Sequence, residues 1–432
     1  MKLNTIRSYP ADYEPPPLPE RLCSQCDLAD LLLHYLAFEV PGLRPPVSDD
    51  GIRRLIDLAF FTSIAPEEGR FPRFNISCQQ DFGAPFTVTR FDPIALDNVD
   101  ALRRLAPSCT HSECALMVSQ RDERMWCDGV VNVGQMGFDT MPGRPEFTSG
   151  GGRPSIQIAV IGPGHMIARS GTMAYELREG RIRQVSSCWY VPAVKTFREE
   201  LARYLERELV QREGEDARTL FGGSKGSVPI HVILSTMLRV GVDARHGGTF
   251  VIIPSDSCEC DSYDIHLKYV ARDLDLGVHM IDFWCACAET TRKRLQDGYT
   301  RAIRSWTFHK TNMLLAAEAV GNLSCVDGCV VLNRRLQLCG FGGEIQVSDQ
   351  AAKDAPRSFT DYKTGKEWKY DDFLKGIGGT RHKSAARLCK AHDGLLVFIM
   401  SQDGELKVFS SDGDKVNAFG PLDVTRAPVG MA

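Results

Sequence analysis

The sequence predicts an α/β protein in which an α+β N-terminal domain precedes a C-terminal mixed β-sheet flanked by helices. Beyond about residue 225, the short apolar runs GGTFVIIP, VDGCVVL and GLLVFIM alternate with helical stretches, as expected for a buried sheet covered by helices. Before that point, amphipathic helices and glycine-punctuated alternating segments predominate. The 432 residues, 43% of them hydrophobic, suffice for two or three domains.

The N-terminal region begins with a Pro-rich arm at residues 1–20. An apolar helical stretch, LADLLLHYLAF, follows, and DDGIRRLIDLAFFTSIA predicts a second helix. The apolar residues of this second helix share one face: Ile52, Leu55, Ile56, Leu58 and Ala59. Both helices belong to a predicted α+β N-terminal domain that spans residues 21–224 and is expected to have a regulatory or sensor role.

The rest of this domain combines strands, a long helix and a glycine-rich boundary. The segment SIQIAVIGPGHMIARSGTMAYELREGRIR predicts antiparallel strands, and LREGRIR is typical of a hairpin. Residues 192–213 predict a long amphipathic helix of mixed charge. The sequence GEDARTLFGGSKGS, which has few large apolar groups, places the domain boundary near residue 225.

The second domain is predicted to span residues 225–415. A helix precedes the strand GGTFVIIP, two helices cover roughly residues 284–320, and the strand VDGCVVL is followed by a second strand through LQLCGFGGEI. A polar segment at 348–373 separates them from the strand GLLVFIMS and the hairpin strand DGELKVFSS. Residues 416–432 are expected to form a C-terminal tail.

Bulk composition limits the possible partners. The formal net charge of −4 and the pI of about 6.2 do not favour binding to long nucleic acid, which usually needs a concentrated basic face, although local basic pockets remain compatible with them. The N-terminal residues contain no apolar h-region, and no run approaches the roughly 20 apolar residues that cross a bilayer. We therefore expect a cytoplasmic protein without a membrane partner.

The fifteen cysteines are predicted to be reduced thiols that act as small apolar residues. Only Cys23 and Cys26 have the spacing of a zinc knuckle, and no second knuckle follows them. Other close pairs have one residue between the two cysteines, as in Cys285 and Cys287. This pattern does not favour a cysteine-ligated metal.

Three polar motifs of the second domain could form one site. The first is an acid and a glycine at the start of an apolar strand, Asp327-Gly328-Cys329. The second is a glycine turn that opens a helix, Gly379-Thr380-Arg381-His382-Lys383, where backbone N–H groups and a guanidinium could bind a phosphate. The third follows a strand, Ser401-Gln402-Asp403-Gly404. Each motif is also compatible with an ordinary turn.

The order of these motifs, VDGCVVL, GTRHKSAA and GLLVFIMSQDGELKVF, resembles that of the diadenylate cyclase domain. In that family an Asp-Gly-Ala strand and a Gly-Thr-Arg-His-Arg loop build an ATP site. The resemblance covers about residues 230–412. It implies the fold of that domain and its reaction, the condensation of two ATP molecules into cyclic di-AMP. Because two domains meet face to face in this reaction, an active protein would be a homodimer or a higher homo-oligomer.

The resemblance assigns roles residue by residue. Asp327 would hold Mg²⁺ or Mn²⁺, together with Asp403, and help to activate a 3′-hydroxyl. Arg381 and His382 would join Asp327 as catalytic residues by binding the triphosphate. The nucleotide-binding residues implied by the matching motifs are Gly328, Cys329, Gly379, Thr380, Lys383 and Ser401. The protein would contribute mainly positioning and charge neutralisation.

Three departures leave the activity open. Cys329 replaces an alanine, and Lys383 replaces an arginine and loses its planar fork. The family's Ser-Glu-Glu becomes Ser-Gln-Asp, so a metal-assisting carboxylate is either lost at Gln402 or shortened at Asp403. The sequence favours a cyclase of ATP or a related nucleotide. The alternatives are a sensor that binds a nucleotide or cyclic dinucleotide without turnover, and a scaffold whose pocket is vestigial.

The N-terminal region adds a second resemblance. With FFTSIAPEEGRFPRFNI and IGPGHMIARSGTMAYELREGRIR, the whole chain is similar to uncharacterised bacterial proteins in which a domain of this fold is regarded as a probable sensor of nucleotide-signal defence systems. Glu67, Glu68, Gly69 and Arg70 are its most distinctive motif. The same four residues are also compatible with the charged end of a helix. The sequence contains no motif for the base or for the ligand of the N-terminal domain.

Overall fold

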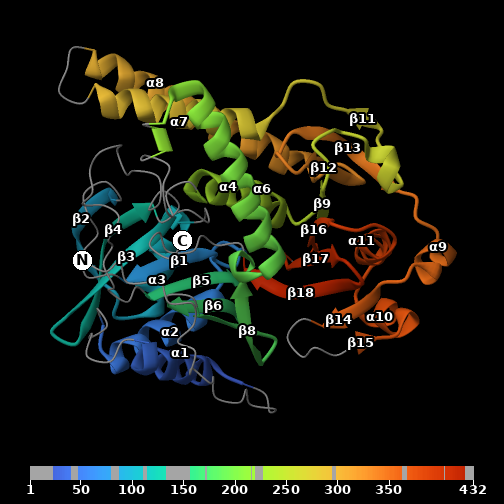
Figure 1. Ribbon diagram of the computed structural model, residues 1–432. Helices are drawn as coiled ribbons and strands as arrows, with labels where there is room; N and C mark the ends of the chain where they lie inside the picture. The colour runs from blue at the N-terminus through green and yellow to red at the C-terminus, as the bar shows by residue number, and fades with distance from the viewer. Residues whose placement is uncertain are drawn as a thin grey trace. The chain divides into compact units, whose positions relative to one another are not determined.

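The computed structural model describes most of the chain and divides it into two compact units, which meet in sequence at Ser186 and Ser187. The described residues are 23–39, 47–78, 87–109, 114–132, 156–170, 173–215, 217–218, 227–293, 298–361, 367–402 and 404–423. The predicted Pro-rich arm, Asp403 and the last part of the predicted tail lie outside them. Each unit has its own sheet and its own core (Figure 1).

Unit 1 is a mixed sheet with helices packed on it. Its helical segments are α1 (Gln25–Glu39), α2 (Asp49–Ser63), α3 (Val99–Leu105) and the short η2 (Ala106–Cys109). Its strands are β1 (Phe74–Cys78), β2 (Thr87–Ala95), β3 (Cys114–Arg121), β4 (Arg124–Asn132), β5 (Ile156–Gly162), β6 (His165–Ser170), β7 (Met173–Arg178) and β8 (Arg181–Ser187). Hydrogen bonding places them in the order β2-β4-β3-β1-β5-β6-β7-β8, in which only β1 and β3 are parallel.

The core of unit 1 lies between this sheet and its first two helices. Helix α1 packs on β6 and β7, and α2 packs on β4, β5 and β6. The predicted apolar face of α2 is confirmed, since Ile52, Leu55, Ile56, Leu58 and Ala59 are all buried. The predicted hairpin is also confirmed: β7 and β8 are joined by Glu179 and Gly180, both at positive φ, as in a two-residue turn that matches strand twist.

Unit 2 is built around three neighbouring strands that pair in the order β12-β9-β16. Its helical segments are η4 (Cys188–Tyr190), α4 (Pro192–Glu213), α6 (Ser227–Ala244), η6 (Cys260–Tyr263), α7 (Leu276–Arg292), α8 (Tyr299–Leu323), α9 (Asp349–Asp354), α10 (Tyr370–Gly376) and α11 (Thr380–Ala391). Its strands are β9 (Gly248–Ile253), β10 (Ile265–His266), β11 (Tyr269–Val270), β12 (Cys329–Asn333), β13 (Leu338–Ile345), β14 (Ser358–Asp361), β15 (Glu367–Trp368), β16 (Leu396–Met400), β17 (Leu406–Asp412) and β18 (Lys415–Asp423).

The sheet of unit 2 is mixed. Strands β9 and β12 are parallel, whereas β9 and β16 are antiparallel. The sheet continues from β16 through β17, β18 and β14 to β15, and from β12 to β13, which also pairs with β10 and β11. The ladder shows that residues 416–423 belong to a strand and not to a tail, because β18 pairs with both β17 and β14.

Helices complete the core of unit 2. Helix α11 packs on β9, β13, β16, β17 and β18, as Figure 1 shows at the right of the molecule. Helix α6 packs on β16 and on α8, and α4 packs on α6 and α7. These contacts group residues 192–213 with the second unit, on the C-terminal side of Ser186, although the sequence places the boundary near residue 225.

Candidate functional site

Strand polarity brings two of the three predicted motifs to one edge of the unit 2 sheet. Because β9 and β12 are parallel and β16 is antiparallel to β9, the starts of β9 and β12 lie beside the end of β16. Asp327 and Gly328 directly precede β12, and Ser401 and Gln402 directly follow β16. The edge therefore carries a carboxylate, a hydroxyl and a carboxamide.

The third motif reaches the same edge through helix α11. Arg381, in the first turn of α11, places Nη2 3.5 Å from Oδ1 of Asp327. It also lies close to Gly247, the residue before β9. A Cβ atom added to Gly247 would be 3.0 Å from Nη1 of Arg381 and 3.5 Å from Cγ of Gln402. Arg381 is thus the side chain that connects the motifs.

The start of α11 offers further hydrogen-bond donors. Gly379 is the N-cap, with no side-chain cap bond, and the N–H of Lys383 donates to the carbonyl of Gly379 at 3.2 Å. The first N–H groups of an α-helix have no partner within the helix and carry its positive dipole end. Gly379 and Thr380 are exposed, so these donors and the Thr380 hydroxyl are open to a ligand.

Asp327 is almost fully solvent-accessible, with 96% of its side chain exposed, whereas Arg381 is 38% exposed. An ion pair this exposed contributes little to stability. The neighbouring Gly328 fixes the position of Asp327, because its φ is +112° and a Cβ atom there would lie 2.5 Å from the carbonyl carbon of Gly342. Only glycine satisfies both conditions.

His382 lies beneath this edge and not on it. Its side chain is buried, and a Cβ atom on Gly378 would lie 3.0 Å from its Nδ1. Burial, aided by the nearby charge of Lys407 and opposed by that of Glu405, lowers the pKa of His382 to about 4. Its Nε2 is buried without a hydrogen-bond partner among the described residues. The imidazole is therefore neutral and supports the glycine turn.

The remaining predicted residues differ in accessibility. Cys329 is 2% exposed, and burial raises the pKa of its thiol to about 12, so only its backbone could face a ligand. The Ser401 hydroxyl accepts a hydrogen bond from the N–H of Glu405 at 3.1 Å, which closes the turn between β16 and β17. Lys383 is half-buried and has no ion pair within the described part of the chain.

The predicted metal site is incomplete in the described part of the chain. No three His, Cys, Asp or Glu side chains of the described residues gather where they could hold a metal ion. Asp403, the second predicted ligand, is outside those residues. Asp327 could supply one carboxylate oxygen to Mg²⁺ or Mn²⁺, which prefer oxygen ligands.

Sequence reasoning missed Gly247. Its φ is +70°, and a Cβ atom there would lie 3.2 Å from the carbonyl oxygen of Met400 as well as close to Arg381. A side chain would therefore displace the guanidinium from the strand edge. The paired glycines that open GGTFVIIP are the signal that could have identified this position, since glycine allows close approach of another group.

Unit 1 contains a separate charged cluster. Oε1 of Glu176 on β7 lies 2.5 Å from Nε2 of His165 on β6, and Oε2 accepts a hydrogen bond from Nε of Arg183 on β8. Burial alone would raise the pKa of Glu176, but the hydrogen bonds and charges of His165 and Arg183 outweigh it and lower that pKa to about 2. The buried carboxylate of Glu176 thus has a hydrogen-bond partner on each neighbouring strand.

The motif PEEGR is a tight turn. The N–H of Glu67 donates to the carbonyl of Arg70 at 2.8 Å, and the N–H of Arg70 donates back at 2.9 Å. Glu68 and Gly69, between them, both have positive φ. Glu68, Gly69 and Arg70 are exposed, so the turn presents charge to solvent and is not the end of a helix.

Comparison with known proteins gives one family. Residues 43–132, which include α2, α3 and β1 to β4, match the family described as "Probable sensor domain DACNV". This match covers less than half of the chain. It agrees with the resemblance of the sequence to bacterial proteins that contain a probable sensor domain. No curated protein and no solved structure matches the chain.

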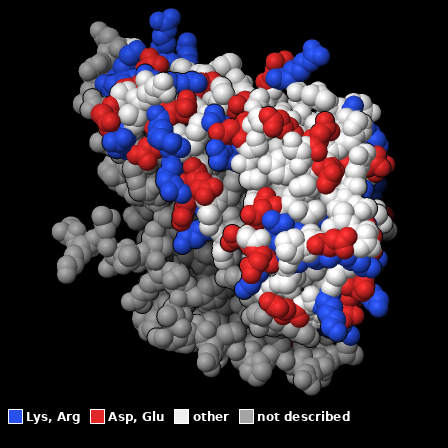
Figure 2. Space-filling model, turned by 45° about the vertical axis from the view of Figure 1, so that its right-hand side comes forward, with Lys and Arg blue, Asp and Glu red and all other residues white. Residues whose placement is uncertain are grey.

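Helix hydrophobicity and surface charge indicate which kinds of partner the protein could bind. Within the described residues, no helix is both long enough and apolar enough to cross a bilayer. On the face that Figure 2 shows, blue Lys and Arg side chains lie interspersed with red Asp and Glu, and neither sign covers a broad continuous area. Charge on this face is mixed on the scale of single side chains.

Proposed function

We propose that the protein is a nucleotide sensor in which unit 2 binds the phosphates of a nucleotide or cyclic dinucleotide. The observation that carries this proposal is the position of Arg381, at the open start of α11 and 3.5 Å from Asp327. The match of residues 43–132 to a probable sensor domain supports a signal-recognition role. In this proposal unit 1 relays or adjusts the response to the bound nucleotide.

The chemistry of the edge suits a phosphate. The N–H groups of the first α11 turn point toward the exposed start of the helix, where the dipole favours an anion. Arg381 adds a guanidinium that can hold two phosphate oxygens at once. An incoming phosphate would displace Asp327 from its long ion pair at little cost, because that pair is exposed.

Binding is better supported than turnover. Phosphoryl transfer depends on positioned cations that neutralise charge as it develops. Lys383 supplies a point charge where the resembling family has a planar fork, and the metal-assisting carboxylate of that family is either replaced by the carboxamide of Gln402 or shortened at Asp403. Both changes preserve attraction for a phosphate. They also weaken the positioning of the phosphate and metal that in-line attack requires.

A cyclase of ATP is the second candidate, and the exposure of Asp327 favours it. A carboxylate that is 96% exposed at a strand mouth is free to take a divalent ion. Mg²⁺ or Mn²⁺ bound there, with Asp403, would polarise a phosphate and lower the pKa of a 3′-hydroxyl. Each subunit would present one ATP, so this activity requires a homodimer or higher homo-oligomer.

Direct binding measurements test the sensor proposal. We expect cyclic di-AMP or ATP with Mg²⁺ to bind the full chain in isothermal titration calorimetry, and Arg381→Ala to weaken the affinity by about tenfold or more. Lys375→Ala is the matched control, because Lys375 is an exposed cation in the last turn of the preceding helix α10. Equal affinities for the Arg381→Ala variant and the wild type would refute the assignment.

A further inference from the structure

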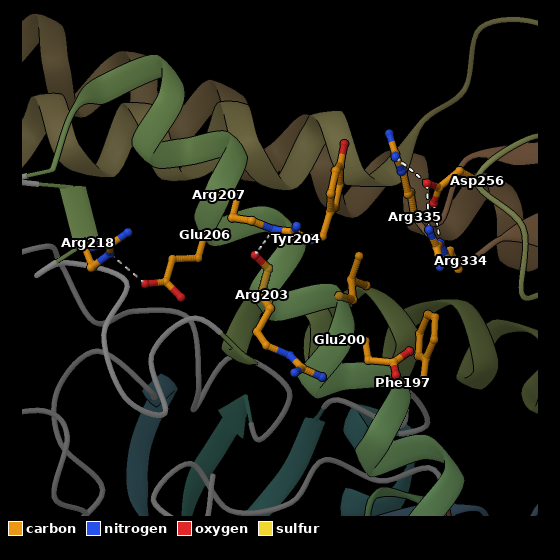
Figure 3. A pocket seen from close by; sticks show the side chains of 11 residues that line it. Phe197, Glu200, Arg203, Tyr204, Glu206, Arg207, Arg218, Asp256, Arg334 and Arg335 are labelled. Atoms are coloured by element: carbon orange, nitrogen blue, oxygen red, sulfur yellow. Dashed lines mark hydrogen bonds and ion pairs between the residues drawn. The ribbon is translucent and has the colours of Figure 1, made fainter.

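A second cavity lies at the opposite end of the same strands. It has a volume of about 660 Å³, within the range of small-molecule sites. Its described walls are α4, Arg218 and the turns that follow β9 and β12, whereas Asp327 and Gly247 lie before those strands. Figure 3 shows the lining side chains along α4, with Arg334 and Arg335 facing it from the β12 turn.

The lining is rich in arginine. Five arginines face three acids, Glu200, Glu206 and Asp256, so the formal charge of the lining is positive. Two of the arginines, Arg203 and Arg207, lie one helical turn apart on α4. Like charges at this spacing repel each other.

Within the described part of the chain, the terminal nitrogens of Arg203 and Arg207 have no partner and can bind a ligand. Nε of Arg203 donates to the carbonyl of Glu199, and Nε of Arg207 donates to the carbonyl of Arg203, both at 3.3 Å. Neither guanidinium forms an ion pair with any residue that the structure describes, and both side chains are exposed. The two Nε bonds hold the guanidiniums along the helix.

The opposite wall also has more positive than negative charge. Asp256 accepts hydrogen bonds from Nη2 of Arg334 at 2.8 Å and from Nη2 of Arg335 at 2.6 Å. The Arg335 guanidinium also lies over the Tyr204 ring, 4.7 Å from its centroid. The single carboxylate of Asp256 thus orients Arg334 and Arg335 but neutralises only one positive charge. The Tyr204 ring also holds the Arg335 guanidinium in place.

We propose that this cavity is a second ligand site of unit 2, which takes a phosphorylated small molecule. Arg203 and Arg207 bind phosphate oxygens from one side, and Arg334 and Arg335 bind from the other. A phosphate suits the site better than a carboxylate does, because its greater charge and its additional oxygens match several guanidiniums at once. The site is distinct from the edge that holds Asp327 and extends the proposed function to two ligands.

Pyrophosphate titrated into the full-length chain tests this site by calorimetry. The Arg381→Ala variant serves as background, so that the first site does not contribute. We expect one equivalent of pyrophosphate to bind, and Arg203→Gln and Arg207→Gln each to weaken binding by about tenfold. Glu200→Gln removes a lining carboxylate and should tighten binding.

Lys195→Gln is the matched control. Lys195 is an exposed cation on the same helix, outside the cavity, whose ion pair with Glu199 is long at 4.0 Å. Its loss should leave the pyrophosphate affinity unchanged. Circular dichroism and the melting temperature establish that each variant is folded.

The site would be refuted in two ways. One is the absence of pyrophosphate binding in the Arg381→Ala background. The other is an unchanged affinity when Arg203→Gln and Arg207→Gln are combined in a folded protein. Neither result depends on whether nucleotides bind near Asp327, so failure of this site and failure of the proposed sensor function are distinguishable.

Discussion

The imidazole of His382 is buried, although it belongs to a motif that is predicted to bind a phosphate. The resemblance to the diadenylate cyclase domain assigns it a catalytic role through contact with a triphosphate. In the structure the ring is 8% exposed and packs against Gly378. A residue two positions into a helix can face the core as readily as the ligand, and a sequence motif does not distinguish the two directions.

The buried His382 predicts a pH dependence of stability. Its pKa is lowered to about 4, so the neutral form is favoured in the folded protein. Its contribution to the stability of the folded state is fully present above about 6.5, the pKa of the group in the unfolded chain. That contribution is lost as the pH falls toward 4. Over that window we expect unit 2 to lose on the order of 3 kcal/mol of unfolding free energy from this group.

Denaturant unfolding of the full chain at pH 7 and at pH 5 measures this effect. The His382→Gln variant, which has no titrating ring, should show a smaller difference between the two pH values than the wild type. An equal pH dependence in both proteins would mean that His382 is not the titrating group.

A side chain at Gly328, just before β12, is expected to destabilise the protein. Gly328→Ala adds a Cβ atom 2.5 Å from Gly342 at a φ of +112°. We expect the change to destabilise unit 2 by at least about 1–3 kcal/mol, the cost of such backbone strain, and to weaken nucleotide binding by moving Asp327. Gly376→Ala is the control, since nothing lies within 4 Å of a Cβ atom there. Thermal unfolding that ranks the two variants equally would contradict this explanation.

At the level of secondary structure, strong periodicity was sufficient for prediction. The apolar face of α2, the 22-residue helix α4 and the β7–β8 hairpin are all confirmed. The polar segment at 348–373 contains α9, β14, β15 and α10, which are too short to produce a clear period. Strand β18 was missed, although it forms a hairpin with β17 and also pairs with the more distant β14.

One capping interaction gives a prediction for the segment that matches the sensor family. The Ser48 hydroxyl accepts from the N–H of Gly51 at 3.1 Å and from Nε2 of Gln120 at 3.0 Å, so it caps α2 and joins it to β3. Ser48→Ala should lower the unfolding free energy of unit 1 by about 1 kcal/mol. Chemical denaturation measures the change.

A double-mutant cycle with Gln120→Ala provides the control. Because Gln120 binds both the backbone N–H and the hydroxyl of Ser48, the two substitutions should be less than additive. Strict additivity would show that the contact between α2 and β3 carries no energy of its own.

At the level of the whole molecule, the sequence placed the polar motifs in order but could not place the cavity beside α4. Arg203, Asp256 and Arg334 come from segments that are far apart in the chain, and no spacing rule connects them. The boundary near residue 225 followed from glycine and serine content. The structure groups α4 with the second unit because α4 packs on α6 and α7.

The central claim is that unit 2 binds a nucleotide without turning it over. The most direct measurement incubates the purified chain with ATP and Mn²⁺, analyses the products by mass spectrometry, and records the melting temperature with ATP or cyclic di-AMP in excess. We predict a raised melting temperature, since a ligand that binds only the folded state stabilises it, and no cyclic dinucleotide product. A cyclic di-AMP mass that disappears in the Asp327→Asn variant would contradict the sensor account and establish a cyclase.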